Sequence, residues 1–312
     1  MPDEPLVYIL VLNFNGRKHL EYCLPDILAT DYPRFQVALV DNHSTDDSVG
    51  YVRAHFPGVE IIQIGKNIGW AGGNNIGIRY ARQHGAHYVV LANNDIRVHP
   101  QWVRSAVLAF ASDPKIAFVG CTVLGDIRAV PLLEYEKACA EWRTIEFAVT
   151  DRYIDGMALF ADVVVFDQIG MIDEGYFAYC EEMDLEIRAQ KAGFKRAMTN
   201  VPVWHYSRGT FGQMPLKGAL LGIRNNIRLA IKQRSVFGVI RAIAREYYVG
   251  CWPFFKGDMT KVTILRSRPF HPVVNFFLVT YCLLWNVVFL PVTLKRRWEE
   301  GRLIRRTLKE GK

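Results

Sequence analysis

The sequence predicts an α/β fold whose mostly parallel, twisted sheet is flanked by helices. Short apolar runs of strand length alternate with helical segments over the first 121 residues. Such continuous apolar runs are typical of parallel strands that are buried on both faces. Polar residues follow these strands directly, and sheets of this kind bind ligands at the carboxyl ends of their strands. The pattern therefore predicts a ligand site along one edge of the sheet.

The first half of the chain should contain five strands, at Val7–Leu12, Val37–Val40, Val59–Ile64, Tyr88–Ala92 and Ile116–Cys121. A helix is expected from about Arg17 to Leu28, disturbed by Pro25. After the second strand, Ser44 should cap a helix that carries Asp46 and Asp47 in its first turn, where the helix dipole favours anions. A turn rich in glycine and asparagine then opens another helix before the fourth strand.

The second half of the chain has a less regular pattern. Asp155–Phe160 is predicted to be a strand, and Asp162–Gly170 a short helix. A longer helix is expected over residues 181–192, with Gly193 as its C-cap.

Charge is distributed unevenly along the chain, whose net charge is +7. Residues 217–312 hold 19 Lys and Arg against 5 Asp and Glu, whereas the first 216 residues hold 19 against 26. We expect an α/β domain at 1–215 and a basic, apolar, helical C-terminal region at 216–312. Because that region is also rich in Phe, Leu, Val and Trp, its expected partner is an anionic membrane surface and not a nucleic acid.

Composition narrows the class of protein. With 50% hydrophobic and 22% charged residues, the chain is neither disordered nor a polytopic membrane protein. Its six cysteines are scattered without a C-x-x-C pair, which favours reduced, buried thiols in a cytosolic protein. Met1–Pro5 is short and acidic, so no signal peptide is expected and the α/β domain should be cytoplasmic.

Polar residues at the strand ends are the first candidates for function. Asp41 ends the second strand, where a carboxylate can accept hydrogen bonds from a nucleobase imide or a ribose hydroxyl. A plain helix cap would account for Ser44 but not for Asp41. Residues 65–77 combine Asn67 and Asn74 with glycines, which let backbone N–H groups approach a phosphate at a helix N-terminus. The alternative is a glycine-rich turn without function.

The turn after the first strand distinguishes between nucleotide-binding folds. A dinucleotide-binding protein would carry G-x-G-x-x-G there, and this chain has Asn13-Phe14-Asn15-Gly16, which gives a dehydrogenase no support. A nucleotidyltransferase, which remains an alternative, would normally show a loop rich in glycine and lysine at the same place. The turn therefore favours neither class.

Two further residues are candidate metal ligands. Asp95 follows the fourth strand, where a lone carboxylate can reach a Mg²⁺ or Mn²⁺ bound to a diphosphate. Asn-Asp turns are also common without function. His205, beside Trp204, could serve as a metal ligand or a diphosphate donor if it faces the site, although such a histidine is more often structural.

The segment from Asp173 to Arg188 is the richest in acidic groups. Asp184 and Arg188 form a favourable i, i+4 pair, which indicates a structural role for Asp184. Glu181 and Glu182 are adjacent and point about 100° apart on a helix, so they cannot share one task. One of them could act as a general base on a sugar hydroxyl. The alternative is a solvated acidic helix start.

Together these stretches resemble the family 2 glycosyltransferases of the GT-A fold, particularly the bacterial rhamnosyltransferase-like branch. The matching stretches are V-L-N-F-N-G at 11–16, V-D-N-H-S-T-D at 40–46, K-N-I-G-W-A-G-G-N-N-I-G at 66–77, L-A-N-N-D at 91–95, I-D-E-G-Y-F-A-Y-C-E-E-M-D-L-E-I-R at 172–188, A-G-F at 192–194 and V-W-H at 203–205. They follow the family's order and spacing over about residues 6–210. Each motif is weak alone, whereas the ordered set is highly specific.

The resemblance implies roles for individual positions. Asp41 would contact the base or ribose, Asp95 would be the metal-binding end of the family's D-x-D-like motif, and Glu182 stands where the family usually has its catalytic aspartate. His205 matches a histidine that completes the metal or diphosphate site in relatives. Nucleotide or substrate contacts are also expected from Asn13, Asn15, Asn67, Gly69, Asn74, Asn94, Glu181 and Trp204.

The implied reaction is an inverting, in-line transfer of a sugar from a nucleoside diphosphate to a hydroxyl of a glycan or lipid-linked acceptor, as in polysaccharide synthesis. Glu182 would be the base, and a Mg²⁺ or Mn²⁺ at Asp95 would neutralise the leaving group. The branch suggests dTDP-rhamnose as the donor, and a UDP-sugar is the next alternative. Two departures are a single carboxylate in residues 93–95 and a glutamate one methylene longer than the usual aspartate at 182. A sugar-nucleotide or glycan-binding protein without catalysis is the non-enzyme alternative.

The C-terminal region extends beyond the resemblance. Arg224, Arg228 and Lys232 recur every four residues and predict a basic stripe on a helix. Pro272–Leu294 contains no charge, and its 23 residues are long enough to span a bilayer. Basic residues after this segment disfavour a simple crossing. An interfacial or re-entrant hairpin is therefore favoured over a span or a buried contact, which would hold the catalytic domain at the inner face of the membrane.

Overall fold

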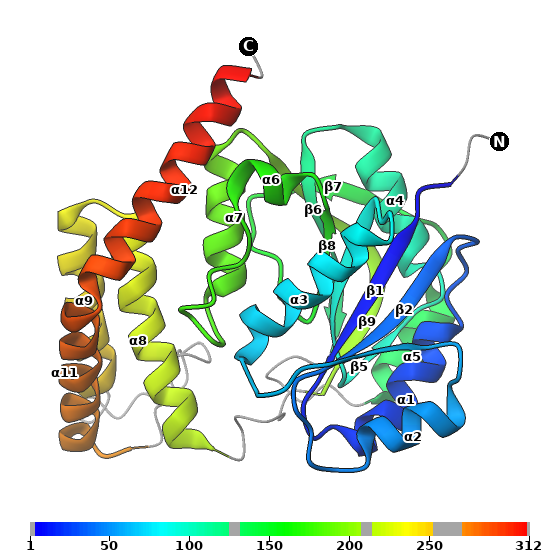
Figure 1. The fold of residues 1–312 in the computed structure, drawn as a ribbon, viewed down its shortest axis with the longest axis horizontal. Coiled ribbons are helices and arrows are strands. Elements are labelled where there is room, and N and C mark those ends of the chain that lie inside the picture. Colours follow the sequence, from blue (N-terminus) through cyan, green and yellow to red (C-terminus); the bar gives the residue numbers. More distant parts are fainter. Residues whose placement is uncertain (1–3, 125–131, 207–213, 252–269, 311–312) are drawn as a thin grey trace.

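The computed structural model describes residues 4–124, 132–206, 214–251 and 270–310 (Figure 1). Its strands are β1 Val7–Asn13, β2 Phe35–Asp41, β3 Glu60–Gln63, β4 Tyr88–Asn93, β5 Ile96–Val98, β6 Ile116–Leu124, β7 Phe147–Val149, β8 Ala158–Asp162 and β9 Lys195–His205. The helices are α1 Arg17–Leu28, α2 Ser48–His55, α3 Gly69–Gln83, α4 Trp102–Ser112, α5 Leu132–Glu141, α6 Val165–Ile169, α7 Glu181–Lys191, α8 Pro215–Gln233, α9 Val236–Cys251, α11 Pro272–Val288 and α12 Leu290–Glu310.

Within the described residues, the strands form one sheet in the order β3-β2-β1-β4-β8-β6-β9-β5, and β7 pairs with β9. The pairs among β3, β2, β1 and β4 are parallel, as the alternation of strands and helices predicts. In the second half β8 runs antiparallel to both β4 and β6, and β5 and β7 run antiparallel to β9. Strands β6 and β9 pair in parallel again. The sheet is therefore mixed, because the antiparallel pairs made by β8 join two groups of parallel strands, and β5 and β7 add antiparallel pairs at β9.

A hydrophobic core lies on each face of the sheet. Successive residues of β1 point to opposite faces, so Ile9 and Val11 join one core while Tyr8 and Leu10 join the other. Helices α1 and α4 cover the first face, and α3, α6 and α7 cover the second (Figure 1). This arrangement leaves the carboxyl ends of β1, β2 and β4 together at one edge.

Several local expectations need correction. The helix after β2 begins at Ser48, and Ser44 does not cap it because its hydroxyl accepts hydrogen bonds from Asn13 Nδ2 and Asn15 N. Asp46 lies before the helix and accepts a hydrogen bond from Ser48 N. The predicted strand near residue 155 begins at Ala158, and β5 was not expected because it has only three residues. The cap of α7 is Ala192, followed by Gly193 with φ +90°.

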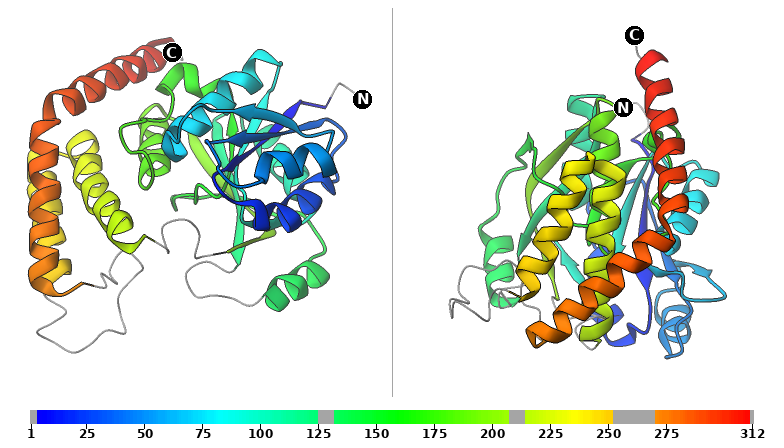
Figure 2. Two further views of the ribbon diagram at one scale, coloured as in Figure 1. Left: turned by 60° about the horizontal axis from the view of Figure 1, so that its bottom comes forward. Right: turned by 90° about the vertical axis from the view of Figure 1, so that its left-hand side faces the viewer.

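The C-terminal helices build a third hydrophobic cluster, in which Ile223 and Ile227 of α8 pack with Val279 and Cys282 of α11. Helix α8 lies between α7 and the outer helices α9 and α11, and α12 extends past α6 and α7 (Figures 1 and 2). Among the described helices, none is both long and apolar enough to cross a bilayer alone. The consecutive helices α11 and α12 pass that test together but are bent by 63°.

The basic stripe on α8 does not face outward. Arg228 and Lys232 are buried and form ion pairs with Asp173, at 2.9 Å in both cases. The sequence period locates these residues on one helix face correctly. The sequence does not show that this face turns inward, because its partner Asp173 lies more than 50 residues away along the chain.

Candidate active site

The ends of β1, β2 and β4 meet through one buried asparagine. Asn13 Nδ2 donates to Asp41 Oδ1 at 3.1 Å, and Asn13 Oδ1 accepts from Asn94 Nδ2 at 2.6 Å. Asp41 Oδ2 also accepts from Ser44 N. Because β1 pairs in parallel with both neighbours, the three strand ends reach the same level of the sheet. The predicted convergence of polar strand ends is therefore present.

The other expected nucleotide contacts lie around this edge and are engaged within the protein. Asn15 Oδ1 accepts from Thr45 N at 2.7 Å, and Asn67 Oδ1 accepts from Gly69 N at 2.9 Å. Asn74 is fully buried and donates to Trp70 O. Within the described part of the chain, its Oδ1 has no hydrogen-bond partner. These side chains thus hold the loops that frame the edge of the sheet.

The N-terminus of α3 is occupied by the protein itself. Trp70 N and Ala71 N donate to Phe177 O, at 2.7 and 3.4 Å. Gly69 has φ +78°, and a Cβ built there would lie 2.3 Å from Phe177 O, so only glycine fits this close approach. Two of the backbone donors expected to approach a phosphate thus bind a carbonyl oxygen of the protein in this structure.

Asp95 and His205 form the clearest polar pair of this edge. Their Oδ1 and Nε2 atoms lie 3.2 Å apart, and Asp95 is buried. Strand pairing brings these two side chains together. Strand β5 starts directly after Asp95 and pairs antiparallel with β9, where Ile96 faces His205. Asp95 Oδ1 accepts no hydrogen bond from the described residues. An oxygen and a nitrogen ligand side by side fit a divalent cation such as Mn²⁺.

An aromatic wall surrounds that pair and includes residues that sequence reasoning missed. The His19 ring of α1 lies 5.2 Å from the ring of Tyr206 at an angle of 46°, and its Nδ1 lies 2.7 Å from Tyr22 OH. The Tyr22 ring lies 6.3 Å from that of Trp204. Burial lowers the pKa of His19, while Asp95 acts in the opposite direction and thus lies close to the imidazole. No motif marked His19, because it stands inside an ordinary helix.

Helix α7 begins with two adjacent carboxyls that have few polar partners. Glu181 is buried, and its Oε2 accepts no hydrogen bond from the described chain. Desolvation raises its pKa well above the ordinary value, and the charge of Glu182 adds to this. Desolvation, together with the charge of Asp155, raises the pKa of Glu182 to about 7. A carboxyl with this pKa can accept a proton at neutral pH.

Three consecutive residues connect Glu182 to the strand edge. Asp155 is close enough to Glu182 to raise its pKa. A Cβ on the next residue, Gly156, would lie 3.0 Å from the Trp70 ring, and Met157 O accepts a hydrogen bond from Asn93 N at 2.9 Å. Trp70 Nε1 in turn donates to Asn93 Oδ1 at 3.2 Å. The start of α7 therefore lies on the side of the sheet where Asn93–Asp95 ends.

A second group of carboxyls is already neutralised. Asp173, Asp184 and Glu300 present oxygens within 4.8 Å of one another, a spacing that could suit a metal ion. Lys232 Nζ lies among them, at 2.9, 2.9 and 2.8 Å. Arg188 also pairs with Asp184 at 3.0 Å, as its i, i+4 spacing predicts. The lysine takes the place a cation would need, so this cluster is structural.

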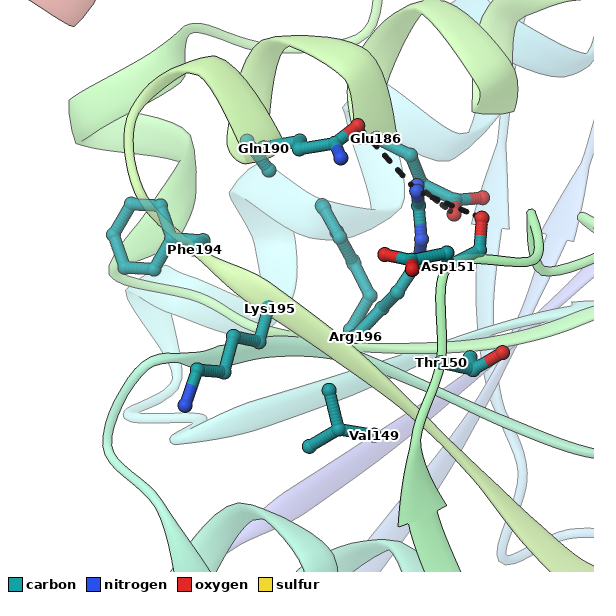
Figure 3. A pocket seen from close by; sticks show the side chains of 10 residues that line it. Val149, Thr150, Asp151, Glu186, Gln190, Phe194, Lys195 and Arg196 are labelled. Carbon is teal, nitrogen blue, oxygen red and sulfur yellow. Dashed lines mark hydrogen bonds and ion pairs between the residues drawn. The ribbon is translucent and has the colours of Figure 1, made fainter.

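A cavity of about 290 Å³ lies elsewhere, between the second half of α7 and the start of β9 (Figure 3). Glu186 and Arg196 form an ion pair of 3.0 Å in its wall. Glu186 also accepts a hydrogen bond from Ile154 N, and its pKa is raised by burial to about 8. The cavity is lined by the first residues of β9, at the opposite end of that strand from His205. It is not the candidate active site.

Residues 8–151 match the model of the family described as glycosyl transferase family 2. The chain carries a family 2 glycosyltransferase domain. It is 24% identical over 240 residues to N-acetylglucosaminyl-diphospho-decaprenol L-rhamnosyltransferase of Mycobacterium tuberculosis, covering 66% of this chain and 78% of the relative. The predicted family and the rhamnosyltransferase-like resemblance are confirmed.

Two solved glycosyltransferase structures have folds similar to that of this chain. A mannosyltransferase from Pyrobaculum calidifontis in complex with GDP-Man and Mn²⁺ has a TM-score of 0.56 at 15% identity, covering 100% of this chain and 89% of that chain. GalNAc-T7 with UDP, GalNAc and Mn²⁺ has a TM-score of 0.57 at 14% identity, covering 80% of this chain and about half, 51%, of the other. The predicted GT-A fold is confirmed.

Proposed function

We propose that this glycosyltransferase is inverting and moves a sugar from a nucleoside diphosphate to a hydroxyl of a glycan or lipid-linked acceptor. The observation that carries the proposal is the placement of Glu182. Its carboxyl has a pKa of about 7 and stands at the helix start that residues 155–157 connect to the Asp95 edge. A base and a cation-binding pair at one edge are the groups that this displacement requires.

The step proceeds as a single displacement at the anomeric carbon. Glu182 takes the proton of the acceptor hydroxyl while the hydroxyl oxygen forms a bond to that carbon. The bond from the carbon to the diphosphate oxygen breaks, and its electron pair leaves with the nucleoside diphosphate. Asp95 and His205 would hold a Mg²⁺ or Mn²⁺, which when bound supplies charge neutralisation for the leaving group.

For the substrates, we propose a dTDP- or UDP-sugar, with rhamnose favoured, and a lipid-linked acceptor. The support is the relative from M. tuberculosis, whose name specifies a rhamnosyltransferase acting on a decaprenol-linked acceptor. Asp41, Asn13 and Asn94 form the polar edge that would face the nucleoside. A thermal-shift panel of nucleotide sugars, with and without Mn²⁺, identifies the donor as the compound that raises the melting temperature most.

Glu182→Gln tests the mechanism. The amide keeps the shape of the side chain but cannot take the proton, so turnover should fall by about a hundredfold or more with donor binding nearly intact. Steady-state release of nucleoside diphosphate in the presence of acceptor measures the effect. Glu141→Gln, at an exposed position of α5, is the matched control. Equal turnover in the Glu182 variant and the wild type would exclude this role, and a wild type that binds donor without releasing diphosphate would indicate a binding protein.

We also propose that an anionic membrane surface binds the outer helices and brings the catalytic domain to lipid-linked acceptors at the inner face of the membrane. Large apolar side chains are exposed on these helices: Val236, Phe237 and Ile240 of α9, Phe276, Phe277, Tyr281, Leu284 and Val288 of α11, and Val292, Leu294 and Trp298 of α12. Basic side chains are also exposed on α12, where Lys295 and Arg306 are each 76% exposed. An apolar face next to basic residues is typical of membrane-surface binding.

Flotation with lipid vesicles tests the docking surface. The full chain should float with vesicles that contain anionic lipid and much less with neutral vesicles, because Lys and Arg near the surface add attraction. Phe277→Asp, at a side chain 65% exposed, should weaken flotation severalfold, whereas Leu133→Asp, 68% exposed on α5, should not. Equal behaviour of the two variants contradicts the proposed surface.

A further inference from the structure

The segment that leads into α7 has a strained backbone. Phe177, Tyr179 and Cys180 have φ of 67°, 74° and 72°, in the left-handed region, and none of them is glycine. Side chains in this region clash with the following carbonyl, so such residues rarely occur in a cluster. Cys180 is directly followed by Glu181 and Glu182. The conformation that presents these carboxyls therefore needs contacts that outweigh the strain.

Helix α8 supplies these contacts from one face. Asn225 is fully buried, and its Nδ2 lies within hydrogen-bond distance of three carbonyl oxygens, Tyr176 O at 2.9 Å, Ala178 O at 2.7 Å and Tyr179 O at 2.9 Å. Its Oδ1 accepts from Arg224 Nε at 2.8 Å, which fixes the orientation of the amide. Arg224 Nη2 also donates to Tyr176 O at 2.5 Å. One amide thus binds the strained turn along its length.

The same face of α8 holds the ends of the segment. Arg228 and Lys232, on the turns that follow Asn225, bind the Asp173 carboxylate at its start. Lys232 and Gln233 bind Asp184, one turn into α7, at 2.9 and 2.7 Å. The segment 173–184 is therefore clamped by α8 at both ends and in the middle.

The opposite side of the segment contacts the candidate nucleotide edge. Phe177 O accepts from Trp70 N, and Glu174 Oε1 accepts from Asn75 Nδ2 at 3.0 Å, both on α3. Trp70 Nε1 reaches Asn93, two residues before Asp95. A shift of the segment would thus move the carboxyls of α7 relative to the strand ends.

We propose that Asn225 is a positioning residue for sugar transfer, which holds the turn 176–180 so that Glu182 stands at the acceptor hydroxyl. Asn225 touches neither substrate nor reacting atoms and acts through the backbone carbonyls of that turn. This inference rests on the proposed role of Glu182. It assigns a function to α8, which lies outside residues 8–151 that match the family model.

The test replaces Asn225 by Ala, which removes the amide, and by Asp, which keeps its shape but cannot donate from an ionised carboxylate. In both variants kcat should fall by at least about tenfold while the donor KM changes by less than about threefold, since a misplaced base affects the reaction more than ground-state binding. Asn286→Ala is the control, because this buried asparagine of α11 also donates to two carbonyls, Arg224 O and Cys282 O, but none in the turn. It should retain the kcat of the wild type.

Amide hydrogen exchange gives a readout that does not depend on activity. Residues 176–182 should exchange at least about tenfold faster in Asn225→Ala than in the wild type and stay unchanged in Asn286→Ala. An unchanged kcat, or unchanged exchange in this segment, overturns the inference. If the wild type transfers no sugar, the proposed function fails, and exchange alone then decides whether the clamp exists.

A second pair of variants measures the strain and leaves the buried core intact. Tyr179 is 39% exposed, so Tyr179→Gly and Tyr179→Ala lose nearly the same contacts. Glycine adopts φ of 74° without a clash, and therefore the Gly variant should melt at a higher temperature than the Ala variant, the reverse of the usual order. An Ala variant as stable as the Gly variant would remove the strain that Asn225 is inferred to offset.

Discussion

Asp184 and Glu182 stand two residues apart on α7 and have opposite electrostatic environments. Asp184 is fully buried, yet Lys232 and Arg188 outweigh the effect of burial and hold its pKa below the ordinary value. Among the described residues no such cation acts on Glu182, and desolvation with the charge of Asp155 raises its pKa to about 7. The two faces of one helix thus carry a permanently ionised group and a group that can exchange a proton near neutral pH.

This difference shows that the number of acidic groups does not identify a reactive site. The cluster of Asp173, Asp184 and Glu300 contains more carboxyls than the strand edge, but Lys232 neutralises it. A reactive carboxyl is expected where no lysine or arginine side chain forms an ion pair with it. Three predictions test this contrast, from the largest expected effect to the smallest.

Lys232→Met should leave the carboxyls of Asp173, Asp184 and Glu300 without the cation that they share. The difference between this cluster and the carboxyls at the start of α7 should then disappear. Breaking a buried ion pair by removing one partner costs about 3–5 kcal/mol, and the free energy of unfolding should fall by this amount. Urea unfolding measures it. Lys295→Met, at a side chain 76% exposed, should change the stability by less than about 0.5 kcal/mol. A Lys232 variant as stable as the control contradicts the structural role of the cluster.

Asp95→Asn should abolish the cation-binding pair with His205 while leaving the fold intact. Sugar transfer should fall by about a hundredfold to a thousandfold, the magnitude typical of losing one preorganised electrostatic group. The rise in melting temperature that Mn²⁺ produces in the presence of nucleoside diphosphate should also disappear. Asp167→Asn, at an exposed carboxyl paired with Arg82, is the control. Full Mn²⁺ response in Asp95→Asn would place the metal elsewhere.

The pH dependence of turnover sharpens the comparison at Glu182. A general base works only when deprotonated, so kcat should level off about one pH unit above the pKa of about 7 and fall about tenfold per pH unit well below it. Asp184 should contribute nothing to this limb, since its lowered pKa keeps it ionised throughout the range. A profile that stays flat down to pH 5 would show that another group takes the proton.

Local patterns made most of the fold and several site positions predictable. The buried strands β1, β2 and β4 are continuous apolar runs, and parallel pairing brings the polar residues after them to one edge. The spacing of Asp184 and Arg188 gave their ion pair correctly. Each of these features depends on neighbours within one turn or one strand, which is the range a single sequence can express.

The remainder depends on contacts between distant residues. Ser44 has the residue type of a helix cap, but Asn13 and Asn15 compete for its hydroxyl across the sheet edge. The period of the basic stripe on α8 does not reveal that it faces inward, because its partner Asp173 is far away in the sequence. The left-handed turn before α7 contains no glycine, so its conformation leaves no signal in the residue types.

The burial of Lys232 also limits how the protein can be shortened for experiments. A version ending at residue 215, where the composition changes, would leave Asp173 without its counter-charges and Asp184 with Arg188 alone, and it would free the turn that Asn225 holds. Glu300 of α12 forms an ion pair with the same lysine, so a chain that ends after α8 would lose this part of the cluster as well. Solubility is therefore better sought by surface substitution on the outer helices than by truncation.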